Sequence, residues 1–534
     1  MRPRAIIVAV ILTIVLLTGG ALMERGMRGA GSAVAGGRLF EQVMARVATS
    51  YVDSVPLGAL YDKATTGLLE ELDDPHSVLL RAERLRALTE STSGRYGGVG
   101  IQMDLRDGWI TVVAPLPGSP AARAGIQTGD RIVEIEGKTT EGWTGDEASK
   151  ALRGEPGTPL DLVIERPGVG TPVPVHLERE IIKVASVSRA RMLGNGVGYV
   201  DLTIFSERSA RELREAVEKL RGEGMRSLVL DLRGNPGGLL DQGVQIAELF
   251  LDPGSKVVAT RGRTPDATRD YTDDDRQSWP QMPIVVLLDH GSASASEIVA
   301  GALQDQDRAA IVGERSFGKG SAQSLFPLGE DGALKLTTAK WYTPLGRSID
   351  RHVPSSDDDE DAPGADGAPR EQKRTSSGRV VYGGGGIVPD VVLGDTARPA
   401  AELALEAELG RELPRFRDAV VAYALELRGS GAVKSPDYAV TPAMRDAVYE
   451  RLQRRGIRLA RTTYDAAEPV VTRVLDAQIA RFVFGPDVEF ERALKRDRSL
   501  ALALQLLNGA ASPEQLLERT TAMQAARSDS TKKR

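Results

Sequence analysis

The chain has 534 residues, which is too long for one hydrophobic core, so three or four domains are expected. Apolar residues make up 41% and charged residues 27%, as in globular proteins, and a net charge of −6 without a basic, aromatic-rich face argues against nucleic acid as a partner. The absence of cysteine excludes disulfides, a cysteine nucleophile and thiolate metal sites, and the four scattered histidines form no HExxH helix, so no metal site is expected.

The amino terminus is basic and then uncharged. Met1–Arg4 carries two arginines, and no charged residue follows until after Met23. As a helix, residues 5–23 would span about 28 Å, close to the thickness of one bilayer core. Residues 1–23 are therefore predicted to be a signal anchor that crosses a membrane, with the amino end in the cytoplasm. An uncleaved anchor is favoured on length, since Ala33-Val34-Ala35 has the form of a cleavage site but lies well beyond the apolar run.

Residues 37–95 show helical spacing of apolar side chains, for example at Leu39 and Val43. The segment Asp73-Asp74-Pro75-His76-Ser77 interrupts this pattern with turn and helix-cap chemistry. We predict an N-terminal helical region here, in which His76 is a hydrogen-bonded turn residue rather than a catalyst.

From residue 96 to residue 180 the pattern changes to short strands separated by glycine turns. A glycine loop, Tyr96–Ile101, enters a strand, and Gly118–Ile126 and Thr128–Ile135 follow it. This order resembles the PDZ domains of bacterial envelope proteases. The resemblance implies that N–H groups of the glycine loop receive the terminal carboxylate of a peptide, while the next strand pairs with the peptide. The loop residues are Gly98, Val99, Gly100 and Ile101. Glycines alone would indicate no more than a tight turn.

Residues 181–395 alternate between strands and helices, as expected of an α/β core. Val197–Leu202 and Ser227–Leu232 are strand-like, and Glu207–Arg221 between them has helical spacing. The second of these strands ends in the glycine-rich turn Asp231–Gly238. Such a turn presents backbone N–H groups that suit an oxyanion hole or a phosphate, although the glycines can also serve the turn alone.

The next strand, Pro283–Leu288, leads through a Ser/Ala/Gly turn into a helix-like stretch. This arrangement can lift a serine hydroxyl above the sheet edge, beside free backbone N–H groups. A lysine follows in the glycine-tight loop Phe317–Gly320. Serine needs a base to become a nucleophile, and lysine, with an ordinary pKa of about 10.4, serves as that base only when it is desolvated. A serine of this turn, Ser294 or one of its neighbours, and Lys319 are therefore the candidate nucleophile and general base.

From the residues alone, other interpretations of this region stay open. Ser292 or Ser296 could be the nucleophile instead, with one of the serines capping the helix. His290 lies four residues before the candidate serine and is a rival base, though no GxSxG elbow accompanies it. Gly313–Lys319 imitates the GxxxxGK of a phosphate loop, but Gly320 stands where that loop needs Ser or Thr, and strand character follows.

Residues 354–386 are polar and glycine-rich and include the acidic run Asp357–Asp361, so a disordered surface insertion is predicted. The acidic run lacks the alternating ligand spacing of a calcium loop. Ile387–Val392 returns to strand character. Residues 396–525 have a helical pattern rich in Ala, Leu, Glu and Arg, which predicts a helical C-terminal extension used for packing or oligomerisation.

Together the motifs resemble those of the C-terminal processing peptidases, or tail-specific proteases, over residues 40 to 395. The resemblance rests on Ser292–Ile298 followed by Phe317–Gly320. The Pro75-His76-Ser77 turn, the PDZ pattern, the Asp231–Gly238 turn and Ile387–Val391 agree with it in their order along the chain.

The resemblance implies a role for individual residues. Ser294 would be the nucleophile, Lys319, 25 positions later, its base, and Gln323 a support for the lysine. The oxyanion hole would be formed by the N–H groups of Ala295 and of Gly237 or Gly238.

The sequence thus predicts a multidomain α/β (α+β) protein made of a membrane helix, a helical lead-in, a PDZ domain, an α/β protease core and a helical extension. Its expected function is a serine endopeptidase with a Ser–Lys dyad, which cleaves exported proteins near their carboxyl termini and needs neither metal nor organic cofactor. The PDZ domain would capture the substrate terminus, and its movement would gate the site. The expected location is the bacterial cell envelope, with the catalytic part anchored on the periplasmic side, or secreted if the signal is cleaved. A homodimer through the helical ends is a further expectation.

Two other functions compete with this prediction. One is a PDZ-bearing envelope scaffold with an inactive protease fold, and the intact Ser294, Lys319 and Gln323 argue against it. The other is a trypsin-like envelope protease with a PDZ domain. That protease should carry its Ser/His/Asp machinery before the PDZ domain, where the short helical segment has no room.

Overall fold

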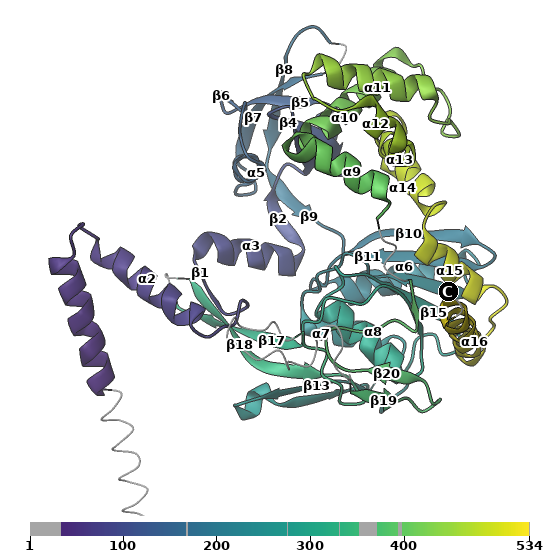
Figure 1. Cartoon of the computed structure of the whole chain (residues 1–534). Coiled ribbons are helices and arrows are strands. Elements are labelled where there is room, and N and C mark those ends of the chain that lie inside the picture. The colour runs from purple at the N-terminus through teal and green to yellow at the C-terminus, as the bar shows by residue number, and fades with distance from the viewer. Residues whose placement is uncertain are drawn as a thin grey trace, which may run out of the picture. The chain divides into compact units, whose positions relative to one another are not determined.

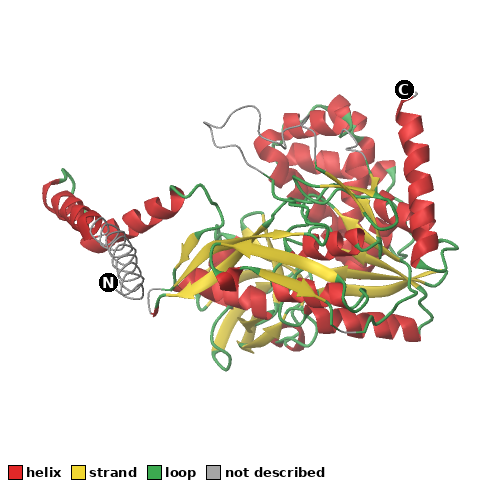
Figure 2. Cartoon of the chain, turned by 90° about the horizontal axis from the view of Figure 1, so that it is seen from below, coloured by secondary structure: helices red, strands yellow, loops and turns green. Residues whose placement is uncertain are grey.

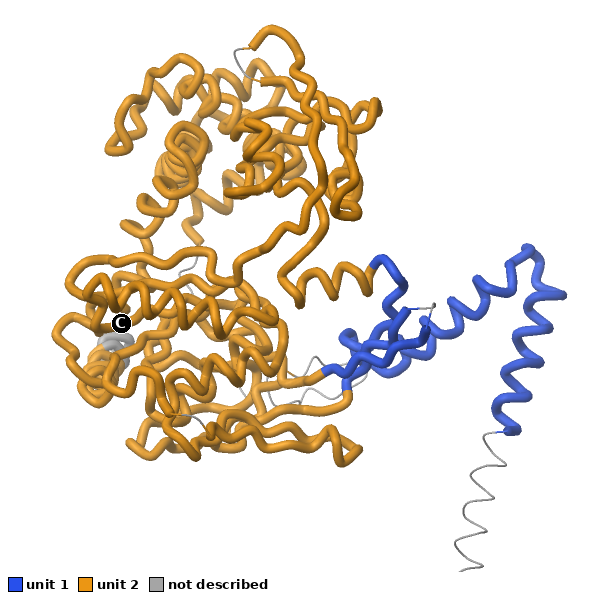
Figure 3. The backbone as a smooth tube through the Cα atoms, turned by 180° about the vertical axis from the view of Figure 1, so that it is seen from behind, with its two compact units in different colours: residues 1–83, 323–337 blue, residues 84–322, 338–534 orange. Residues whose placement is uncertain are grey.

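The computed structural model describes residues 34–166, 169–274, 276–329, 332–351, 371–393 and 398–532. The chain forms two compact units, one of residues 1–83 with 323–337 and the other of residues 84–322 with 338–534 (Figure 3). The predicted anchor, residues 1–23, lies outside the described part. Among the helices that are described, none combines the length and the apolar character needed to cross a bilayer.

The first unit consists of helices followed by a small antiparallel sheet. Its elements are a helix over 34–50, α2 (Leu57–Glu70), β1 (Val78–Leu80), most of β17 (Ser321–Pro327) and the first half of β18 (Ala333–Tyr342). β18 pairs with both β1 and β17. The turn before β1 is built on Asp74, whose carboxylate accepts the His76 N–H and the Ser77 hydroxyl, so His76 lies in a hydrogen-bonded turn.

The second unit begins with α3 (Ala82–Ser93) and a small β domain. The elements of that domain are β2 (Arg95–Gly98), β3 (Ile101–Arg106), β4 (Trp109–Pro115), α4 (Pro120–Arg123), β5 (Arg131–Ile135), β6 (Lys138–Thr139), α5 (Gly145–Leu152), β7 (Pro159–Glu165), β8 (Val173–Glu178) and β9 (Glu180–Lys183). Its main sheet has the order β3-β4-β5-β7-β8, and β2 pairs with β9. β7 buries Leu160, Leu162 and Ile164 in alternation with more exposed neighbours, the period of a strand with one buried face.

A larger, mostly parallel sheet with helices on both of its faces follows the β domain in the second unit (Figures 1 and 2). The elements are β10 (Val187–Gly194), β11 (Val197–Leu202), α6 (Ser209–Gly222), β12 (Ser227–Asp231), α7 (Leu240–Glu248), β15 (Ile284–Leu288), α8 (Ala295–Asp305), β16 (Ala310–Gly313) and β21 (Val391–Val392). The order is β10-β11-β12-β15-β16-β21, and only the β10–β11 pair of this sheet is antiparallel. Every residue of β12, β15 and β16 is buried, because helices cover both faces of the sheet. Beside it, β13 (Lys256–Gly262) pairs with β14 (Arg269–Thr272) and with the second half of β18.

The two faces of the sheet pack against helices from different parts of the chain. Along β15, Val286 belongs to a cluster with side chains of α6, α7 and α8. Its neighbour Val285 belongs to another cluster, which contains Leu506 of α15 (Arg498–Leu507) and Leu516 of α16 (Pro513–Lys532). The end of the predicted C-terminal extension therefore supplies one layer of the α/β/α core.

The other C-terminal helices form a bundle with a core of its own. They are α9 (Ala400–Leu409), α10 (Leu413–Ser430), α11 (Pro442–Arg454), α12 (Arg461–Ala466) and α13 (Glu468–Ile479). The next helix, α14 (Pro486–Leu494), packs Phe490 and Leu494 against the cluster that covers the sheet. The bundle contacts the turn between β3 and β4, where Asp418 accepts the Asp107 N–H over 3.2 Å and Arg455 donates to the Asp107 carboxylate over 2.6 Å.

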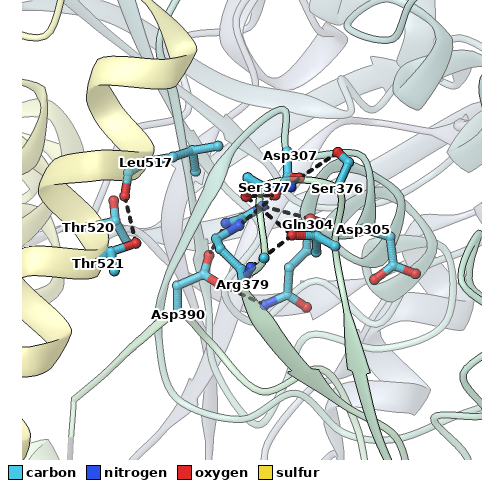
Figure 4. A network of polar contacts seen from close by, with 12 residues as sticks. Gln304, Asp305, Asp307, Ser376, Ser377, Arg379, Asp390, Leu517, Thr520 and Thr521 are labelled. Atoms are coloured by element: carbon cyan, nitrogen blue, oxygen red, sulfur yellow. Dashed lines mark hydrogen bonds and ion pairs between the residues drawn. The ribbon is translucent and has the colours of Figure 1, made fainter.

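The predicted disordered insertion, residues 354–386, is wrong in its second half. Residues 352–370, with the acidic run, lie outside the described part, but β19 (Gln372–Arg374) and β20 (Val380–Tyr382) form a hairpin. Arg379 attaches this hairpin to the core through an ion pair of 2.8 Å with Asp307 and one of 3.0 Å with Asp390 (Figure 4). Ser377 also donates to Asp307, and the Arg347 guanidinium donates to the Tyr382 carbonyl over 2.7 Å. These contacts attach to the core a segment whose composition alone indicates disorder.

Candidate active site

The candidate catalytic residues lie in loops that leave neighbouring parallel strands. β12 pairs with β15, and β15 pairs with β16, with Leu288 opposite Gly313. The loop after β12 contains the glycine turn, the loop after β15 contains Ser294, and the loop after β16 contains Lys319. Because the strands are parallel, all three loops leave the sheet at one edge, which is where open α/β sheets bind their ligands.

Ser294 stands where the loop after β15 turns into α8. Its φ of 55° and ψ of −113° lie in a region that residues with a side chain rarely adopt. Backbone strain of this kind costs about 1–3 kcal/mol and persists only where the surroundings impose it. Ser294 is half-buried, and Ala295 directly after it begins the helix. The hydroxyl is therefore held beside the first-turn N–H groups of α8, which have no partner within the helix.

The two serines that flank Ser294 have structural hydrogen bonds. The hydroxyl of Ser292 donates to the Leu232 carbonyl over 2.8 Å, and that of Ser296 donates to the Asn235 carbonyl over 3.0 Å. Both acceptors belong to the glycine turn after β12. These two hydroxyls hold the neighbouring turns together, and Ser294 is the serine between them.

Gly237 lies directly against the turn that carries Ser294. A Cβ added at Gly237 would lie 2.8 Å from the Ser294 Cβ and 2.9 Å from the Ala295 nitrogen, and its φ is 92°, so glycine is required. The Gly237 N–H donates to the Asn235 side chain over 2.8 Å. The Gly237 N–H is thus close to Ser294, but it already donates a hydrogen bond within its own turn.

Gly238 is the other glycine named for the oxyanion hole. It forms an isolated bridge with Phe205, made by the Phe205 N–H to the Gly237 carbonyl and by the Leu239 N–H to the Phe205 carbonyl. The N–H of Gly238 takes no part in these two bonds. Of the two glycines, Gly238 is therefore the better candidate to act together with Ala295.

Lys319 is fixed through its main chain on both sides. Its N–H donates to Glu297 over 3.0 Å, and its carbonyl accepts the indole N–H of Trp341 over 3.0 Å. The preceding residue, Gly318, has a φ of 91°, and a Cβ added there would lie 2.9 Å from the Gly386 nitrogen. The half-buried lysine thus starts from a rigid backbone, which restricts where its amine can lie.

Glu297 joins the serine turn to the lysine loop. This fully buried carboxylate accepts the Ser294 N–H over 2.7 Å and the Lys319 N–H over 3.0 Å at one oxygen. Its other oxygen accepts the Gly318 N–H over 2.7 Å and the Ser316 hydroxyl over 2.6 Å. Burial raises the pKa of Glu297, and the four hydrogen bonds act in the opposite direction because they favour the carboxylate. One side chain therefore sets the relative position of both candidate catalytic residues.

The rival interpretations find less support in the geometry. His290 is exposed, and its ring lies 3.3 Å from the Glu314 carboxylate. The phosphate-loop imitation is followed by strand β17, whereas a phosphate loop opens a helix. Gln323 belongs to the first unit, where its side-chain amide donates to the Thr337 hydroxyl over 3.2 Å, and its role stays a prediction.

Comparison with known proteins identifies the family. The model of peptidase family S41 matches residues 196–357, and that of the PDZ domain matches residues 111–166. A carboxy-terminal-processing protease of Bartonella bacilliformis is 44% identical over 314 residues, which is 58% of this chain and 71% of that protein. The chain belongs to the carboxy-terminal-processing protease family. It is a serine-type endopeptidase, and the resemblance inferred from its motifs is confirmed.

Other members of the carboxy-terminal-processing protease family are similar over a comparable stretch. The carboxy-terminal processing protease CtpA of Bacillus subtilis is 34% identical over 304 residues, which is 57% of this chain and 64% of that protein. The solved structure of a photosystem II D1 C-terminal processing protease is 29% identical, with a TM-score of 0.37, and the match covers 67% of this chain and 87% of that one.

The PDZ domain of this carboxy-terminal-processing protease places the predicted carboxylate loop before an edge strand. Gly98–Ile101 leads from β2 into β3, and β3 is the end strand of the domain's described sheet. The carbonyl of Gly100 is engaged on the inner side, since it accepts the Leu116 N–H and the Ser119 hydroxyl. An edge strand of this kind can pair with an added peptide strand.

Sequence reasoning missed Glu297 among the residues that build the site. A signal for it was present, since Ser294 and Glu297 have the S-x-x-E spacing of a capping box. A capping box explains the bond to the Ser294 N–H. The bonds to Gly318 and Lys319 cross 21 and 22 residues and depend on the tertiary fold.

Proposed function

We propose that this chain hydrolyses peptide bonds near the carboxyl termini of proteins, with Ser294 as nucleophile and Lys319 as general base. The observation that carries the proposal is the single buried carboxylate of Glu297, which holds the main chain of both residues. Membership of the carboxy-terminal-processing protease family supports the same reaction, since relatives are named for it.

The proposed reaction proceeds in two steps. In the first, the Ser294 oxygen attacks the scissile carbonyl carbon while the neutral amine of Lys319 takes the hydroxyl proton. The proton then passes to the leaving amine, which departs with the C-terminal fragment. In the second step the lysine amine takes a proton from water, and the resulting hydroxide attacks the acyl carbon. The bond between the acyl carbon and the Ser294 oxygen then breaks, and the lysine ammonium returns its proton to that oxygen, which restores the serine and the neutral amine.

The developing oxyanion would be stabilised by main-chain N–H groups. Ala295 supplies the first N–H of α8, and Gly238 supplies one from the adjoining turn. One donor of this type contributes about 3–4 kcal/mol of transition-state stabilisation in serine proteases. Gln323 would orient the lysine amine without adding charge, as its spacing from Lys319 in the family motif suggests.

The PDZ domain would select the substrate by its terminal carboxylate. We propose that this group binds to the N–H groups of the loop Gly98, Val99, Gly100 and Ile101, and that the preceding residues of the substrate pair with β3. The edge position of β3 supports this proposal. An anchor at residues 1–23 would put the enzyme at the cell envelope, facing exported proteins, and a homodimer remains a prediction.

The decisive experiment compares cleavage of one unfolded substrate by the wild type, Ser294→Ala and Lys319→Ala. Each variant is expected to lose turnover while keeping its affinity for a peptide with a free carboxyl terminus. The same peptide with an amidated terminus should bind more weakly to all three proteins. Cleavage that persists in Ser294→Ala would show that another residue is the nucleophile. A wild type that binds the peptide but does not cleave the substrate would favour the scaffold function.

A further inference from the structure

A helix from the end of the chain reaches the loop that follows β12. Within that loop the Arg233 guanidinium donates to the Asp231 carboxylate over 2.6 Å and to the Asp497 carboxylate over 2.7 Å. Asp497 is the N-cap of α15, and it lies outside both segments that the family models match.

Asp497 uses its two oxygens for two different contacts. Oδ1 accepts the Leu500 N–H over 2.9 Å and so caps α15, while Oδ2 accepts the Arg233 guanidinium. The N-terminus of a helix carries a partial positive charge, and a guanidinium next to it is unfavourable unless an anion lies between them. The Asp497 carboxylate is that anion. It allows α15 to approach Arg233.

Helix α14 supports the same cluster from another side. The Tyr199 hydroxyl donates to Asp231 over 2.7 Å, and the Tyr199 ring lies 5.5 Å from the ring of Phe490 in α14. The three charged side chains are largely withdrawn from solvent, with exposures of 5% for Asp231, 24% for Arg233 and 16% for Asp497. Charge pairs at such positions are coupled more strongly than pairs on an open surface.

Asp231, Arg233 and Asp497 lie at the start of the glycine turn, and this turn contacts the turn that carries Ser294. Two residues after Arg233, the Asn235 carbonyl accepts the Ser296 hydroxyl, and the Asn235 side chain accepts the Gly237 N–H. Gly237 in turn lies against Ser294. A displacement of Arg233 would therefore move the glycine turn relative to the nucleophile.

We propose that Asp497 is a positioning residue for catalysis, which acts through Arg233 to hold the glycine turn against Ser294. The inference rests on the proposed function of that site. It also gives the C-terminal helices α14 and α15 a role in the reaction that packing alone would not give them.

The test separates the charge of Asp497 from its capping role in the full-length protein. Asp497→Asn and Asp497→Ser both retain an N-cap side chain but lose the charge, and Asp497→Glu retains the charge. Asp487→Asn is the matched control, because Asp487 is an exposed acidic residue in the first turn of α14. The measurements are kcat and KM for one unfolded substrate and the thermal unfolding midpoint of each protein.

We expect Asp497→Asn and Asp497→Ser to lose about tenfold in kcat with KM unchanged, since small displacements of catalytic groups reduce the rate steeply. Asp497→Glu should recover part of the loss. The neutral variants should unfold at a lower midpoint than Asp487→Asn, because Arg233 loses one of its two carboxylate partners, but they should remain folded at the assay temperature. Wild-type kcat in both neutral variants would overturn the inference, as would a loss of kcat no larger than the unfolded fraction at the assay temperature. If the wild type shows no cleavage that Ser294→Ala abolishes, the proposed function fails instead.

Discussion

Replacing Glu297 by glutamine removes one acceptor oxygen from the carboxylate that joins the serine turn to the lysine loop. Four donors face the two oxygens of Glu297, whereas an amide offers one oxygen and one NH₂ group. The glutamine amide can be placed in two orientations. In the less costly one its NH₂ group faces Ser316 and Gly318. The Ser316 hydroxyl can rotate to accept a hydrogen bond from it, but the Gly318 N–H is left without an acceptor. A buried N–H without a partner costs about 1–3 kcal/mol, so the free energy of unfolding should fall by about that amount.

The expected loss of activity in Glu297→Gln is larger than this loss of stability implies. Relief of the unpaired Gly318 N–H requires the lysine loop to move, and a misplacement of about 1 Å can lower a rate about 100-fold. The assay measures kcat on an unfolded substrate together with urea unfolding. Glu147→Gln is the matched control, since Glu147 occupies the equivalent N3 position of the capping box in α5. A kcat for Glu297→Gln within about threefold of the control would refute the reasoning, because the Glu297 carboxylate would then have no effect on the two candidate catalytic residues.

Three further predictions concern glycine geometry and pH. Gly237→Ala should lose activity about 100-fold because its Cβ would lie within 3 Å of the serine turn, whereas Gly254→Ala, with φ 86° but open space around it, should keep its kcat. Gly100→Ala should weaken binding of a peptide with a free carboxyl terminus, measured by fluorescence anisotropy, because its Cβ has no free space. Gly108→Ala should leave this binding unchanged, because the space around Gly108, like that around Gly254, is open. Burial acts to raise the pKa of Asp307, but hydrogen bonds outweigh it and hold that pKa below 3.8. The Asp307 carboxylate therefore stabilises the fold above pH 3.8, and this stabilisation is lost as the pH falls through the folded pKa. Asp307→Asn should therefore be less stable at neutral pH and show a shallower loss of stability in acid unfolding, and equal acid dependence of the two proteins would contradict this assignment.

The parallel core could be predicted from sequence because its strands are predominantly apolar. Ile284–Leu288 has an apolar side chain at every position, which is expected when both faces of a strand are covered. The pattern did not reveal what covers the second face. Amphipathic spacing in 498–507 indicates that the helix has an apolar side, but the partner of that side is decided by the tertiary fold.

The candidate site could be predicted to the level of its motifs. The residues alone left Ser292, Ser294 and Ser296 as equivalent candidates, and only the family resemblance selected Ser294. In the fold, two of these hydroxyls bind main-chain carbonyls, a distinction that depends on contacts across 60 and 61 residues. The buried Glu297 was missed for the same reason, since a carboxylate in a first helical turn usually indicates a cap exposed to solvent.

The measurement that tests the central claim most directly is the location of a covalent adduct. A peptidyl fluorophosphonate is incubated with the wild type until cleavage stops, and the modified residue is mapped by mass spectrometry, with Ser294→Ala assayed for turnover in parallel. The account predicts an adduct on Ser294 and no turnover by the variant. An adduct on Ser292 or Ser296, or sustained cleavage by Ser294→Ala, would contradict it.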